Sequence, residues 1–123
     1  MFRVIIAGGR DFNNYAGLSA SMDYLLKNVC DEIQIICGMA RGADRLGERY
    51  AKERGYKIRY FPADWDTYGK SAGYRRNVEM ASNADALVAF WDGVSYGTKH
   101  MIDIAKEKGL AIRVKRYVMK GGT

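Results

Sequence analysis

Short apolar runs alternate with longer stretches of helical periodicity along the whole of this 123-residue chain. The runs predict five strands and the stretches between them predict four helices. Such alternation is typical of a parallel sheet covered by helices on both faces. With right-handed crossovers and one reversal of winding, we expect a Rossmann-like α/β/α fold with the strand order 3-2-1-4-5. Strands are expected at 2–7, 32–37, 57–61, 86–91 and 111–118, and helices at 15–29, 43–54, 74–82 and 98–108.

A single domain spanning residues 1–119 accounts for this pattern, and residues 120–123 are expected to fray. The polar and aromatic segment 63–73 is the longest expected connection, and connections of that length often line a site. No stretch approaches the roughly 20 apolar residues of a membrane span, and the chain starts without the apolar region of a signal peptide. We therefore expect a cytoplasmic protein without a membrane partner.

Charged and metal-binding residue types narrow the possible partners. Two cysteines and one histidine are too few for a disulfide framework or a transition-metal site, so no metal is expected. The formal net charge is +6, and each half of the chain carries ten Lys and Arg against seven Asp and Glu. An even excess is typical of a solvated surface, so nucleic acid is not the expected partner.

Three of the expected strands end in glycine-bearing loops that lead toward helices, at 8–12, 38–44 and 91–98. Because the carboxyl ends of parallel strands share one edge, these loops are expected to meet. Glycine lets a backbone approach a ligand closely, and a helix N-terminus offers unpaired N–H groups to an anion. The loops therefore predict a ligand that bears phosphate.

Neither of the common phosphate signatures is present. Gly8-Gly9 lacks the spacing of the dinucleotide fingerprint, and no Walker-type lysine follows the glycines. NAD chemistry and ATP hydrolysis are therefore disfavoured, and the only expected ligand is a nucleotide-type small molecule rather than an assigned cofactor. The residues expected to bind it are Gly8, Gly9, Arg10, Asp11, Gly38, Arg41, Gly42, Ala43, Asp44, Arg76, Asn77, Trp91, Asp92, Gly93, Ser95, Gly97 and Thr98.

Several of these residues have a structural alternative. Arg41 can hold a phosphate with two donors, or it can pair on the surface with Asp44, which would then cap a helix. Thr98 can likewise bind phosphate or cap the last helix. Trp65, Tyr68 or Trp91 can stack a base or pack against the sheet edge.

Two further features concern charge and catalysis. Arg76 and its neighbour Arg75 are expected at a helix start, where the dipole disfavours cations, and this placement hints at a nearby anion. The acidic residues considered for acid–base chemistry are Asp44, Glu79 and Asp92. No Ser-His-Asp or Cys-His arrangement is indicated by spacing.

Six motifs stand out along the chain: Gly8–Phe12, Gly38–Asp44, Tyr60–Trp65, Arg76–Met80, Ala89–Gly93 and Gly97–Lys99. Together they resemble the SLOG superfamily, which includes the DprA/SMF proteins and the LOG phosphoribohydrolases. The branch that they resemble most is the one called YspA, cpYpsA-related. The resemblance implies a Rossmannoid sheet that binds nucleotides or nucleotide-derived ligands at the glycine loops.

The resemblance also marks a departure from the hydrolase branch. That branch has a Gly-Gly-x-Gly-Thr-x-x-Glu motif whose glutamate is catalytic. Gly97 and Thr98 match it here, but Met101 stands in the glutamate position and the paired glycines are absent. Phosphate binding therefore carries over, whereas glycosidic hydrolysis does not.

Three functions remain open, in this order. The first is a protein that binds, and so senses or processes, a nucleoside phosphate or an ADP-ribose-like compound. In it Arg10, Arg41, Gly42, Gly97 and Thr98 would hold phosphates, and Asp44 or Asp92 a ribose hydroxyl.

The second function is a nucleotide-cleaving hydrolase with Glu79 or Asp92 as its base. The third is a DprA-like nucleic-acid-binding module driven by the net positive charge. Related proteins often dimerise through helices, so the resemblance is also compatible with a homodimer.

Overall fold

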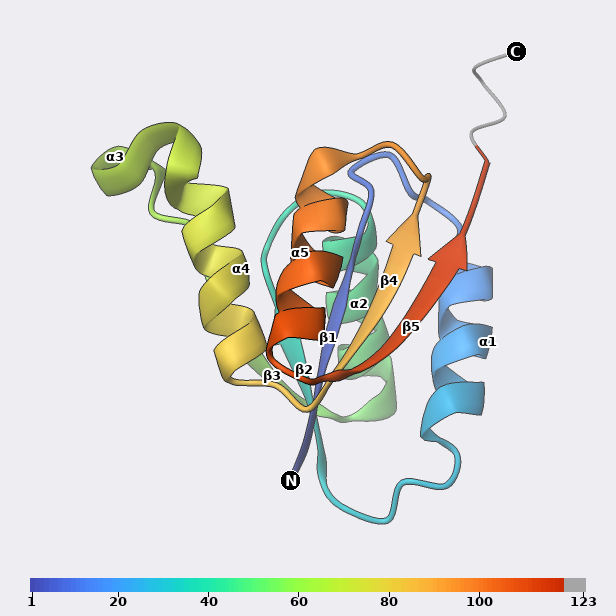
Figure 1. Cartoon of the computed structure of the whole chain (residues 1–123). Coiled ribbons are helices and arrows are strands. Elements are labelled where there is room, and N and C mark those ends of the chain that lie inside the picture. The colour runs from blue at the N-terminus through green and yellow to red at the C-terminus, as the bar shows by residue number, and fades with distance from the viewer. Residues whose placement is uncertain (119–123) are drawn as a thin grey trace.

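The computed structural model describes residues 1–118, and in it strands and helices alternate as the sequence predicts (Figure 1). The expected domain end at 119 and the expected fraying of 120–123 lie outside the described residues. In chain order the elements are β1 (Phe2–Gly8), α1 (Tyr15–Leu26), β2 (Ile33–Cys37), α2 (Ala43–Arg54), β3 (Lys57–Tyr60), α3 (Trp65–Tyr68), the 3₁₀ turn η1 (Gly69–Ser71), α4 (Ala72–Ser82), β4 (Ala86–Trp91), α5 (Tyr96–Glu107) and β5 (Ala111–Arg116).

The five strands form one parallel sheet in the order β3-β2-β1-β4-β5, which confirms the predicted order and the Rossmann-like α/β fold. β1 lies at the centre, where Ile5 pairs with Ile36 of β2 on one side and with Leu87 of β4 on the other. The direction of winding reverses between β1 and β4. At such a switch point the loops that follow the strands separate and leave a crevice.

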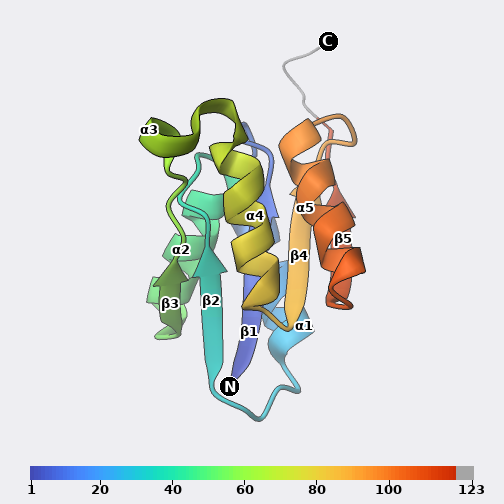
Figure 2. The same cartoon turned by 60° about the vertical axis from the view of Figure 1, so that its left-hand side comes forward.

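Helices cover both faces of the sheet. α1 and α2 lie behind it in the view of Figure 2, and α4 and α5 lie in front. Successive residues of β1 divide between the two cores: Val4 and Ile6 pack toward α1 and α2, whereas Ile5 and Ala7 pack toward α4 and α5. Because β1 is buried on both faces from Val4 to Ala7, this part of the strand is a continuous apolar run. No helix within residues 1–118 is long and apolar enough to cross a membrane.

The connection expected at 63–73 is more ordered than the sequence suggested. It contains α3 and η1, and α4 begins at Ala72 rather than at about 74. The carboxylate of Asp64 accepts the backbone N–H of Thr67 at 3.1 Å and thereby caps α3. A single turn of helix leaves almost no apolar periodicity, so the alternation of residues gave no sign of it. α3 lies at the far end of α4, away from the sheet (Figure 1).

Helix α2 crosses β1 closely at Gly47. A Cβ atom added to Gly47 would lie 2.9 Å from both Cβ and Cγ2 of Ile6, which is closer than carbon atoms pack. The absence of a side chain at this position therefore sets the distance between the helix and the central strand.

We predict that Gly47→Ala lowers the free energy of unfolding by up to about 2 kcal/mol. The overpacking cost of about 1–3 kcal/mol exceeds the gain of about 1 kcal/mol in helix propensity. The matched control is Gly73→Ala in α4, where an added Cβ meets only the Trp65 ring at 3.4 Å, an ordinary contact. The control should be neutral or stabilising. Urea unfolding of both variants checks this, and equal midpoints for the two would contradict it.

Candidate functional site

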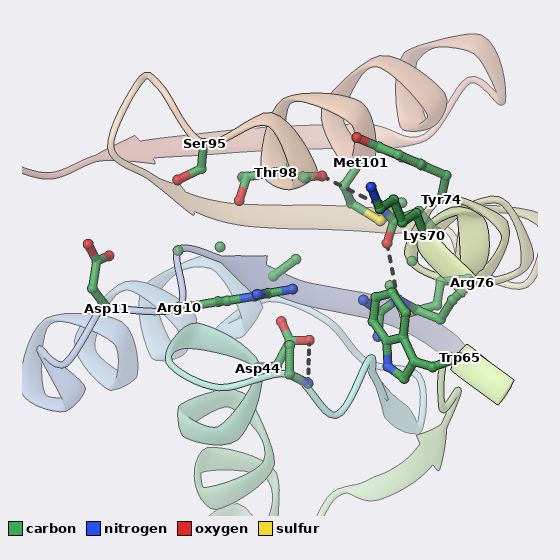
Figure 3. Close-up of a pocket in the computed structure, with 18 residues that line it drawn as sticks. Arg10, Asp11, Asp44, Trp65, Lys70, Tyr74, Arg76, Ser95, Thr98 and Met101 are labelled. Carbon is green, nitrogen blue, oxygen red and sulfur yellow. Dashed lines mark hydrogen bonds between the residues drawn. The ribbon is translucent and has the colours of Figure 1, made fainter. Parts of the chain in front are cut away.

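A cavity of about 400 Å³ opens at the carboxyl edge of the sheet, beside the loops that follow β1 and β4 (Figure 3). Its walls come from the loops after β1, β2 and β4, from the start of α5, and from α3 and α4. The glycine loops therefore do meet, as the parallel sheet requires. The predicted residues that line the cavity are Gly8, Gly9, Arg10, Asp11, Asp44, Arg76, Asn77, Ser95, Gly97 and Thr98.

Three polar side chains are buried among the described residues, and all three line this cavity. Asp44, Asn77 and Thr98 are each 6% exposed. Buried polar groups weaken a fold unless their hydrogen bonds are satisfied, so their concentration at one place marks a site rather than a core. They come from three different helices, α2, α4 and α5.

The N-terminus of α5 faces the cavity without a side-chain cap. Ser95 occupies the N-cap position, but its hydroxyl donates to Asp92 at 2.9 Å instead of accepting from the helix. A Cβ built at Gly97 has no atom within 4 Å, so the space in front of this turn is open. Within residues 1–118, the hydroxyl of Thr98 has no hydrogen-bond partner. The first turn thus presents N–H groups and one hydroxyl to the cavity.

The loop that leads into α5 is held by residues that do not themselves line the cavity. The carboxylate of Asp92 accepts the N–H groups of Val94 and Ser95, each at 2.9 Å. Burial works to raise the pKa of Asp92, but these hydrogen bonds outweigh it and lower the pKa. The indole N–H of Trp91 donates to the Ser95 carbonyl at 3.1 Å, and Gly93 packs against Arg116.

Asp92, Trp91 and Gly93 were predicted to bind ligand, and the structure places them around the loop instead. Gly38, Arg41, Gly42 and Ala43 shape the second loop in the same way without lining the cavity.

Asp44 neither caps α2 nor pairs with Arg41, the two structural roles that the sequence left open for it. The N-cap of α2 is Gly42, which has no side chain to cap with, and Arg41 forms no ion pair within residues 1–118. Instead, Oδ2 of Asp44 accepts the N–H of Ala40 at 3.1 Å (Figure 3). Burial raises the pKa of Asp44, opposed by the Ala40 N–H and by the cations of Arg76 and Arg10.

Arg76 projects into the cavity from the second turn of α4. Because that helix begins at Ala72, the argument that Arg75 and Arg76 occupy a helix start was wrong. The Arg76 guanidinium donates to the carbonyl of Gly38 and, at 3.2 Å, to Oδ1 of Asn77. Burial lowers the pKa of Arg76.

The cations that line the cavity are not neutralised by neighbouring carboxylates. Among residues 1–118, no carboxylate lies within ion-pair distance of Arg10, Lys70 or Arg76. Three cations without ion-pair partners therefore line the cavity with Asp44 and Asp11, and Asp11 already accepts a hydrogen bond from Tyr117 at 2.7 Å. This balance favours an anionic ligand.

The wall formed by α3, η1 and α4 supplies residues that the sequence did not single out as ligand-binding. Trp65 and Tyr74 are half exposed at the rim, and Met80 and Met101 are buried below them. Trp65 was considered only as one of several aromatic residues for stacking. The length of the 63–73 connection was the only indication in the sequence that this segment lines a site, and it contributes Trp65 and Lys70 to the cavity.

The position of Glu79 and the distribution of possible metal ligands can be described as well. Glu79 is exposed on α4 and does not line the cavity, so it is not placed to act on a ligand there. No three His, Cys, Asp or Glu side chains gather as metal ligands would within residues 1–118.

Comparison with known proteins gives matches in both sequence and structure. Residues 2–68 match the YspA, cpYpsA-related SLOG family, which confirms the resemblance carried by the motifs. The chain is 32% identical over 118 residues to the Gene 61 protein of Mycobacterium phage D29, across 91% of this chain and 94% of that protein.

Two solved structures share the fold. DNA processing protein A (DprA) from Streptococcus pneumoniae superimposes with a TM-score of 0.73 at 16% identity, over 98% of this chain but only 52% of DprA. The protein TM1055 superimposes with a TM-score of 0.66 at 18% identity, over 91% of this chain and 72% of TM1055. This chain thus spans about half the length of DprA, and at these identities the likeness concerns the fold.

We predict that Asp44→Asn stabilises the protein at pH 7. The pKa of Asp44 is higher in the folded than in the unfolded chain, so the unfolded state loses its proton first. The stability of the folded state therefore falls as pH rises past the unfolded value of about 3.9. An amide removes this cost, and its advantage should shrink as the pH approaches 3. Thermal unfolding from pH 3 to 7 measures the difference, and a variant that is less stable throughout would refute it.

Proposed function

Because this chain belongs to the YspA, cpYpsA-related SLOG family, which supports a nucleotide-related role, we propose that its cavity binds a nucleoside phosphate or a related nucleotide-derived ligand. The observation that carries the proposal is the uncapped start of α5, with the unpartnered hydroxyl of Thr98 beside it. A phosphate group would accept hydrogen bonds from these donors and gain from the helix dipole.

The phosphate end of the cavity is supported from a second direction. The side chain of Arg10 extends across the cavity from the loop after β1 (Figure 3). It has no ion pair within the described part of the chain, so its guanidinium is available to a phosphate with two parallel donors. Gly97 leaves the space between the helix and this side chain open.

The aromatic end supports a base. Trp65, Tyr74 and Lys70 lie near one another and near Met101 (Figure 3). The half-exposed rings of Trp65 and Tyr74 and the buried thioether side chains of Met80 and Met101 all line the cavity. Aromatic faces stack any base, at a gain of about 1–3 kcal/mol per base. A volume of about 400 Å³ lies in the range of small-molecule sites, which runs from about 300 to 1,000 Å³. Sensing or processing of such a ligand is the role that these features favour.

We predict that Gly97→Asp weakens the binding of adenosine 5′-monophosphate at least about 100-fold, or about 2.7 kcal/mol. The new carboxylate would occupy the phosphate position and repel the ligand. The fold should survive, because the added Cβ meets no atom within 4 Å. Titration calorimetry measures affinity and circular dichroism checks the fold.

The control for that variant is Tyr96→Asp, which places the same charge on the same turn. Tyr96 is 81% exposed and does not line the cavity, so this change should cost less than about threefold in affinity. Undiminished binding by a folded Gly97→Asp protein would place the site elsewhere.

We also predict that the protein does not release base from nucleoside monophosphates faster than about one turnover per second, a low enzymatic rate. Met101, at the position of the hydrolase glutamate, is 1% exposed and has no group that exchanges protons. Chromatography of adenosine and cytidine monophosphates after incubation with the protein is the measurement. Free adenine or cytosine appearing above that rate would favour the hydrolase instead.

A further inference from the structure

The carboxylate of Asp44 has one oxygen that is not used by the protein. Oδ2 accepts the Ala40 N–H at 3.1 Å, whereas Oδ1 has no hydrogen-bond donor among residues 1–118. The side chain is only 6% exposed, and the surface it retains faces the cavity. No fully buried side-chain oxygen in the described residues lacks a partner, so Oδ1 keeps some surface in the cavity, where a ligand can donate to it.

The chemistry of that donor is constrained. A phosphate would be repelled by the carboxylate, and no cation of the described chain lies within ion-pair distance of Asp44. A neutral hydroxyl or N–H group of the ligand can donate to the carboxylate without that repulsion. A pair of neighbouring hydroxyl groups suits a carboxylate best, because both can donate to it at once.

The position of Asp44 in the sheet indicates which part of the ligand supplies the hydroxyl groups. Asp44 follows β2 and the phosphate-facing turn of α5 follows β4, with β1 between them. Asp44 and the start of α5 therefore lie on either side of β1, and both line the cavity. A ligand that contacts both must present its phosphate to one wall and its hydroxyl groups to the other.

We propose that Asp44 reads the vicinal hydroxyl groups of a ribose, so that the cavity selects ribonucleotides over deoxyribonucleotides. The inference rests on the proposed function, since it needs the phosphate at α5. It assigns a specificity-determining role to the wall formed by α2. The position that carries a carboxylate in the hydrolase motif is occupied here by Met101, on the opposite wall from Asp44 (Figure 3).

The test compares adenosine 5′-monophosphate with its 2′-deoxy and 3′-deoxy forms by titration calorimetry on the wild-type chain. Loss of a hydrogen bond to a charged group should weaken binding about 10-fold or more for each deoxy form. Equal affinities for the three ligands would overturn the inference while leaving the proposed function intact. A preference that follows the base, seen with uridine 5′-monophosphate, without a sugar preference would overturn it as well.

The variant Asp44→Asn separates a specific role from a structural one. If the amide oxygen keeps the Ala40 N–H, the NH₂ group faces the cavity as a donor where an acceptor is needed. The ratio of ribo to deoxy affinity should then fall to within about threefold of one, while the deoxy ligand binds at least as well as before. A ratio unchanged from wild type would overturn the inference.

Glu107→Gln, which removes the same charge from the exposed end of α5, serves as the control and should keep the wild-type ratio. Failure of all three adenosine ligands to bind the wild-type chain would overturn the proposed function, and the inference with it.

Discussion

The site depends on one close contact between two backbone segments. The loop after β1 passes between β4 and the start of α2, where the N–H of Ala43 donates to the carbonyl of Gly9 at 3.2 Å. Gly42 has a φ of 72°, and a Cβ atom there would overlap the Gly9 carbonyl. Only glycine permits both the left-handed conformation and this approach. The contact fixes the loop that carries Arg10 against the helix that carries Asp44.

A second network joins the helical walls to this core. Nε of Arg76 donates to Oδ1 of Asn77, and this orients the Asn77 amide. The NH₂ group of Asn77 is then directed toward the carbonyl of Gly97 at 3.4 Å and lies 3.2 Å from Nδ1 of His100. Since Arg76 also donates to Gly38, one chain of hydrogen bonds links the end of β2, helix α4 and the start of α5. The cavity is therefore held open by polar contacts made before any ligand arrives.

The strand order of the sheet could be predicted because apolar runs and stretches of helical periodicity alternate over the whole chain. The sequence predicted the cavity less completely, and the differences have physical causes. Gly42 was expected to bring backbone to a ligand, but it brings backbone against backbone, whereas Gly8 lies against the Phe90 carbonyl and also lines the cavity. Asp92 lies in the expected loop, yet its carboxylate is directed at its own turn. Trp65 reaches the cavity from α3, a single helical turn without a periodic pattern. Such contacts depend on how loops fold back in space, which spacing along the chain does not encode.

The two sides of the cavity carry opposite chemistry, and this limits what the site can do. On the α5 side, Gly97 and Thr98 offer donors, while the neighbouring Met101 contributes only an apolar surface. On the α2 side, Asp44 offers an acceptor kept at a cost in stability, since burial disfavours its charge. Arg10, Lys70 and Arg76 line the same cavity without ion-pair partners among residues 1–118. A ligand that combines an anionic group with neutral donors would satisfy both sides at once.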